Sequence, residues 1–261
     1  MNKLNKLAWV SAITLAILCG CKKEDEPNEP TVIPPKNEVE GSWQNIRTGL
    51  FENIKGQTVV VDKLSTDYEF AHTSYTEKQT FEGRLSSDNT TPITQTRTVT
   101  AAYQLMQGYI KSTVTSYEID GEPIAGKAGQ VRYYFYEILG SSQMQLSEAR
   151  PSVRLSGAEG NIDNSSFYFA DSVYTANGFY SYEHINLLFS NNAIYEYTQI
   201  TTSREMPSWN AGSFYTCPVQ IYSNYYIRVE EPPVHVPYMF LNGVLYNAAP
   251  LSAEENLFLK K

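Results

Sequence analysis

The chain from Gly41 onward consists of short runs rich in Thr, Tyr, Val and Phe, separated by turn residues. β-Branched and aromatic residues favour strands, and the whole sequence contains 20 Tyr and 11 Phe. No stretch predicts a helix of any length. Short strands at this spacing indicate an all-β fold, an antiparallel barrel or sandwich. The expected strands cover residues 58–64, 75–81, 94–105, 109–119, 131–139 and 144–146.

Two further local signals support this prediction. Asp120-Gly121 follows the expected strand at residues 109–119 and is typical of a tight turn between antiparallel strands. Residues 131–139 are apolar at adjacent as well as alternate positions, which predicts a strand that is covered on both faces.

The opening of the strand-rich part also carries a recognisable pattern. Gly41-Ser42-Trp43 is followed by Tyr68-Glu69-Phe70, by Tyr75-Thr76-Glu77-Lys78 and by a threonine-rich meander that runs to Leu146. This pattern resembles the lipocalin-like lipoprotein domains common in Bacteroidota, over about residues 39–150. The resemblance implies a meander barrel at residues 41–150. It also implies that Trp43 plugs the closed end of the barrel and is structural, with no direct role in ligand binding.

Residues 160–261 predict a second β domain, joined to the first through residues 150–161. Phe189, Tyr195 and Thr201 follow one another much as Phe70, Tyr75 and Thr80 do in the first half. A second Gly-x-Trp is missing. We interpret the second half as a degenerate lipocalin-like repeat, and the alternative is an unrelated β-sandwich.

The N-terminus predicts export and lipidation. Lys3 and Lys6 precede an apolar run at residues 7–18, which is too short to span a bilayer and reads as the core of a signal peptide at residues 1–20. Leu18-Cys19-Gly20-Cys21 resembles a bacterial lipobox, although Cys19 is an unusual occupant of its position. The resemblance implies that Cys21 becomes the acylated first residue of the mature chain. The alternative is an ordinary cleaved signal with a cysteine there by chance.

Residues 21–40 predict an extended tether, because prolines at 27, 30, 34 and 35 are closely spaced and have charged residues on either side. Within it, Lys23-Glu24-Asp25-Glu26 is similar to the export signal of Bacteroidota surface lipoproteins. The similarity implies an outer-membrane protein that faces the cell surface. The simpler alternative is that these acidic residues only keep the tether solvated.

No pattern in the sequence predicts catalysis, a metal site or a cofactor. The histidines at 72, 184 and 235 are far apart, and lipidation of Cys21 and removal of Cys19 leave Cys217 without a disulfide partner. The doublets at 230–231 and 254–255 place adjacent glutamates on opposite faces of a strand. Carboxylates distant in sequence can still meet in space. The net charge of −8 argues against nucleic acid as a partner.

Much of the aromatic excess is expected in the core, where Tyr133, Phe135 and Tyr182 lie in strand-like runs, but some rings lie in segments that predict loops. Trp209-Asn210-Ala211-Gly212 combines a flat ring with an amide, the chemistry that stacks on sugars, so Trp209 is the candidate ligand-binding residue. We therefore expect a non-catalytic surface lipoprotein, held to the membrane by its acylated N-terminus, that binds a glycan or a small hydrophobic molecule. One alternative is a structural or adhesive envelope subunit that contacts another protein, and another is a hydrolase with dispersed carboxylates.

Overall fold

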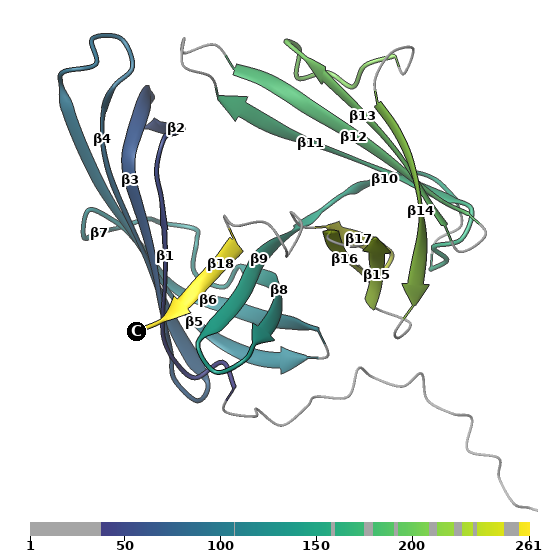
Figure 1. Cartoon of the computed structure of the whole chain (residues 1–261), viewed down its shortest axis with the longest axis horizontal. Coiled ribbons are helices and arrows are strands. Elements are labelled where there is room, and N and C mark those ends of the chain that lie inside the picture. Colours follow the sequence, from purple (N-terminus) through teal and green to yellow (C-terminus); the bar gives the residue numbers. More distant parts are fainter. Residues whose placement is uncertain are drawn as a thin grey trace, which may run out of the picture. The chain divides into compact units, whose positions relative to one another are not determined.

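The computed structural model describes residues 38–106, 108–157, 160–174, 180–190, 193–208, 213–221, 226–231, 234–247 and 256–261. Every regular element in these residues is an antiparallel β-strand, so the predicted all-β fold is confirmed (Figure 1). The described part of the chain contains no helix of the length and hydropathy needed to span a membrane.

The first group of strands begins at the predicted position. Its members are β1 (Gly41–Arg47), β2 (Leu50–Ile54), β3 (Gln57–Phe70), β4 (Ser74–Leu85), β5 (Pro92–Met106), β6 (Tyr109–Ile119), β7 (Glu122–Pro123), β8 (Val131–Leu139) and β9 (Gln143–Pro151). The expected strands at 109–119 and 131–139 coincide with β6 and β8. Asp120 and Gly121 form the predicted turn between β6 and β7, both with positive φ (54° and 84°).

Eight strands close into a barrel. The pairing runs β1–β3–β4–β5–β6–β8–β9 and is completed by β18 (Leu257–Lys260), which pairs with β9 on one side and β1 on the other (Figure 1). Met144 pairs with Phe258, and Trp43 pairs with Lys260. The sequence predicted a barrel at residues 41–150 and a second domain at residues 160–261. In the structure β18, which lies within 160–261, is a strand of the barrel.

Trp43 is part of the barrel core, as its predicted structural role requires. The side chain is 1% exposed, its indole Nε1 donates to the Val39 carbonyl at 2.8 Å, and the Lys260 ammonium lies 5.4 Å from its ring centroid. Aromatic and aliphatic side chains from seven of the eight barrel strands fill the space around it: Tyr68, Phe70, Tyr75, Ala101, Tyr103, Leu105, Ile110, Tyr134, Met144, Leu146 and Phe258. This half of the interior, which we call the aromatic half, is packed.

The strand β8 is covered on both faces, as predicted. Tyr134 and Phe135 are adjacent and therefore point to opposite faces, yet they are 3% and 0% exposed. Tyr134 belongs to the aromatic half. Phe135 packs in a separate cluster with Tyr109 and Met239.

The second group of strands forms a further antiparallel sheet. It contains β10 (Val153–Ser156), β11 (Ser165–Tyr174), β12 (Tyr180–Ser190), β13 (Ala193–Thr201), β14 (Ser213–Ile221), β15 (Tyr226–Glu231), β16 (Val234–Leu241) and β17 (Val244–Asn247). Each strand pairs with the next, and β17 returns to the end of β9. Its core includes Phe167, Leu187, Phe189, Ile194, Tyr238, Phe240 and Leu245. A second β unit is thus present, and the internal repeat remains an interpretation of the sequence.

Candidate ligand-binding site

The lining of the barrel changes from aromatic to charged along β4 and β8. On β4, alternate residues share the inner face, and Tyr75 of the aromatic half is followed by Glu77 and Gln79. On β8, Arg132 precedes Tyr134 by two residues and shares its face. We call the inward-facing residues Arg47, Glu77, Gln79, Arg97, Arg132 and Glu148, together with Glu52 of β2, the charged half.

Arg132 connects two carboxylates in the charged half. Its Nη1 donates to Glu77 Oε2 at 3.2 Å, and its Nε donates to Glu148 Oε1 at 2.8 Å. The Glu77 side chain is 5% exposed, whereas that of Glu148 is 46% exposed. Glu77 also accepts hydrogen bonds from Gln79 Nε2 at 3.0 Å and from the Tyr134 hydroxyl at 3.4 Å. These hydrogen bonds compensate for the burial of the Glu77 carboxylate. Because Arg132 contacts both buried Glu77 and half-exposed Glu148, it connects the barrel core to the solvent-facing end of the site.

Burial governs the electrostatics of this network. It raises the pKa of Glu77 above its ordinary value, against the opposing attraction of Arg132. Burial likewise raises the pKa of the Tyr134 hydroxyl well above its usual range, and the nearby Glu77 charge adds to this effect. Tyr134 therefore stays protonated and remains a hydrogen-bond donor to Glu77.

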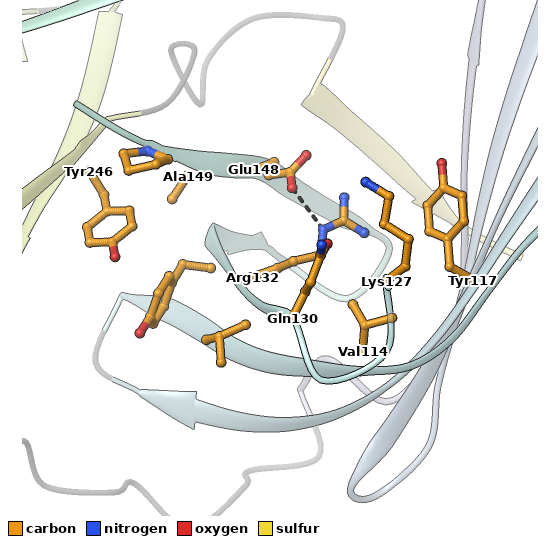
Figure 2. A pocket seen from close by; sticks show the side chains of 11 residues that line it. Val114, Tyr117, Lys127, Gln130, Arg132, Glu148, Ala149 and Tyr246 are labelled. Atoms are coloured by element: carbon orange, nitrogen blue, oxygen red, sulfur yellow. Dashed lines mark hydrogen bonds and ion pairs between the residues drawn. The ribbon is translucent and has the colours of Figure 1, made fainter. Parts of the chain in front are cut away.

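Three hollows adjoin the Arg132–Glu148 ion pair. Two lie among the charged residues, with volumes of about 240 and 260 Å³, and both are lined by Arg47, Glu77 and Gln79. The third, which we call the rim pocket, has a volume of about 520 Å³ (Figure 2). Arg132 and Glu148 line all three hollows.

The rim pocket combines aromatic rings with charged and amide groups. Figure 2 shows Tyr246 at one end, Tyr117 and Lys127 at the other, and the Arg132–Glu148 pair between them. In addition, Tyr133 packs edge-on against Tyr246, with ring centroids 5.0 Å apart. Gln130 also lines the pocket. Rings and convergent polar groups around a hollow of this size are typical of small-molecule sites.

The structure does not test the two site residues predicted from the sequence. Cys21 and Trp209 are outside the described residues, and Cys217 lies on β14, where only the backbone is described. The doublet at 254–255 is also outside the described residues, and the doublet at 230–231 lies on β15.

The three histidines do not gather at one place. His72 is exposed and its Nδ1 lies 3.0 Å from Glu40 Oε1, and His235 lies on β16. His184 is fully buried, where its Nδ1 contacts the Tyr168 hydroxyl at 2.7 Å and its Nε2 lies 2.9 Å from the Ser203 carbonyl oxygen. Within the described ranges, no group of three or more His, Cys, Asp or Glu residues could hold a metal ion.

Sequence reasoning missed the charged half because its members are far apart in the chain. One signal was present: Glu77 interrupts an otherwise strand-forming segment two residues after Tyr75, so both side chains must share the inner face. The structure brings Glu77, Arg132 and Glu148 together from β4, β8 and β9. No protein-family model matches this sequence, and no curated protein or solved structure shows significant similarity to it.

Proposed function

We propose that this chain is a non-catalytic, lipid-anchored binding protein whose rim pocket holds a saccharide unit. The observation that carries the proposal is the 520 Å³ rim pocket, in which tyrosine rings stand around the Arg132–Glu148 ion pair. Its volume lies within the range of about 300–1,000 Å³ that is usual for small-molecule sites.

The chemistry of the pocket suits a sugar. The apolar face of a pyranose ring packs on aromatic side chains, and Tyr117, Tyr133 and Tyr246 offer such rings. Sugar hydroxyls need both donors and acceptors. Gln130 offers an amide, Arg132 a guanidinium and Glu148 a carboxylate that is half exposed.

A hydrophobic ligand fits less well. The aromatic half of the barrel, where an apolar molecule would be expected, is filled by packed side chains such as Tyr68, Phe70 and Tyr75. The two inner hollows beside it are lined mainly by charged and amide groups. Burying an apolar molecule there would desolvate these groups without replacing their hydrogen bonds.

The place of action is proposed from the sequence. Acylation of Cys21 would anchor the chain, and the lysine-acid segment at residues 23–26 favours the outer face of the outer membrane. The Pro-rich tether would then hold the barrel away from the lipid surface. The closed eight-stranded barrel and the buried Trp43 agree with the lipocalin-like resemblance, which we retain as part of the proposal.

A glycan array tests the proposal. The purified protein should retain at least one saccharide, and Tyr246→Ala should lose that retention because the ring face is removed. Tyr246→Phe is the matched control, since it keeps the ring and should keep the binding. Thermal unfolding of all three proteins verifies that they are folded. Absence of any retained glycan, or equal retention by Tyr246→Ala, would refute the proposal.

A hydrolase is the second candidate, because two carboxylates from distant strands line the same hollows. Glu77 and Glu148 both face Arg132, and burial raises the pKa of Glu77 in the direction that a general acid needs. The shared guanidinium holds both groups as acceptors, which favours binding over proton transfer. Turnover of a retained glycan by the wild type, lost in Glu77→Gln, would establish the hydrolase instead.

A further inference from the structure

We propose that the saccharide carries an acidic group, which enters the inner hollow of about 240 Å³ and pairs with Arg97. This inference rests on the proposed function and narrows its ligand to anionic sugars. It is argued from the contacts of Arg97, from the way the hollow adjoins the rim pocket and from the charges that surround it.

Arg97 is held in position by an aromatic ring and an amide, and none of the described carboxylates lies at ion-pair distance from it. Its guanidinium carbon lies 4.4 Å from the centroid of the buried Phe81 ring, and its Nε donates to Gln95 Oε1 at 3.0 Å. Among the described residues, no carboxylate lies within 4.0 Å of this guanidinium. The Phe81 ring and the Gln95 amide therefore hold the guanidinium beside the hollow, and neither group neutralises its positive charge.

Three other described arginines have ionic partners. Arg84 pairs with Asp62 at 2.6 Å, Arg132 pairs with Glu77 and Glu148, and Arg150 pairs with Asp171. An unpaired guanidinium inside a barrel is costly unless it meets an anion. A guanidinium fork matches carboxylate, sulfate and phosphate oxygens, which gives Arg97 a specific ligand chemistry.

The hollow is placed to receive part of a molecule bound in the rim pocket. Tyr117, Arg132 and Glu148 line both spaces, so the two adjoin along these side chains. A sugar ring against the tyrosines can therefore direct an acidic substituent past Tyr117 towards Arg97. The hollow has room for such a group: its volume is about 240 Å³, whereas one water molecule takes up about 30 Å³ and an acidic group is the size of a few water molecules.

Three carboxylates line this hollow: Glu77 and Glu148 pair with Arg132, and Glu52 is the one with which the ligand would compete for Arg97. It lines the same hollow, and burial raises its pKa, while Arg97 and Arg47 attract its charged form from beyond ion-pair distance. The Glu52 carboxylate would repel a bound anion, so removal of this carboxylate should strengthen the binding of an acidic ligand.

The test is a calorimetric titration of the purified protein with matched sugars. The probes are glucose and glucuronate, galactose and galacturonate, and N-acetylglucosamine with its 6-sulfate and 6-phosphate. The wild type should bind at least one acidic member about tenfold more tightly than its neutral counterpart, equivalent to about 1.4 kcal/mol. Arg97→Gln should reduce this ratio to near one, and Glu52→Gln should increase it.

Arg84→Gln is the matched control, because it removes the same charge from the exposed outer surface of the same sheet and should leave the ratio unchanged. The preferred acid identifies the group as carboxylate, sulfate or phosphate. Equal binding of neutral and acidic sugars, or a ratio that Arg97→Gln does not lower, would overturn the inference and leave the proposed function in place. Binding of none of these sugars would overturn the inference, and absence of any retained glycan on the array would overturn the proposed function as well.

Discussion

Replacement of Phe258 by alanine tests whether the C-terminal strand closes the barrel. Phe258 is 5% exposed, and its ring packs edge-on against Tyr68 with centroids 5.3 Å apart. Removal of a buried phenylalanine side chain costs about 3–5 kcal/mol. Since total stabilities are about 5–15 kcal/mol, Phe258→Ala should lose a large part of the free energy of unfolding.

Leu259 provides the control on the same strand. It is 53% exposed and points away from Phe258, so Leu259→Ala should change the free energy of unfolding by about 0.5 kcal/mol or less. Urea unfolding followed by circular dichroism measures both variants, and Phe258→Leu gives an intermediate loss if the alanine variant is too unstable to purify. A loss below about 1 kcal/mol for Phe258→Ala, or an equal loss for Leu259→Ala, would show that β18 is not a barrel strand.

Three further predictions concern other parts of the chain. Labelled palmitate should be incorporated into the wild type and into Cys19→Ser but not into Cys21→Ala. Equal labelling of Cys21→Ala would refute the predicted lipid anchor. Gly83→Ala should destabilise the barrel by more than about 1 kcal/mol in urea unfolding, because the added Cβ would clash with the Val60 carbonyl oxygen, and an unchanged midpoint would contradict that close approach. Burial raises the pKa of Glu77 in the folded state, so its contribution to stability is complete at pH values below its unfolded pKa and is lost as the pH rises through the folded pKa. The stability of the wild type relative to Glu77→Gln should therefore fall as the pH is raised from acidic to neutral, and a rise over the same range would refute the assigned shift.

Local strand patterns were predictable because they depend on residues close in sequence. The strand-forming runs that mark β6 and β8 and the turn at Asp120-Gly121 needed only a few neighbouring residues. Closure by β18 was not predictable in the same way, since Phe258 and its partner Met144 are separated by more than one hundred residues. A four-residue strand carries no signal that selects one sheet edge over another.

The candidate site was hidden for a related reason. Inward-facing Glu77 and Arg132 look like ordinary exposed residues in the sequence, because only the barrel shows that they meet. His184 is a comparable case: it alternates along β12 with half-buried Ile185 and buried Leu187 and so lies on the less apolar face, yet it is fully buried. Its contacts with the Tyr168 hydroxyl and the Ser203 carbonyl satisfy both ring nitrogens, which makes the burial possible.

Amide chemical-shift mapping with a retained glycan tests the central claim most directly. Titration should shift the amides of residues 130–133 and 148–149, which border the rim pocket, together with that of Tyr246. Shifts confined to β11, β12 and β13 of the second sheet would show that the saccharide binds elsewhere and would contradict the proposed site.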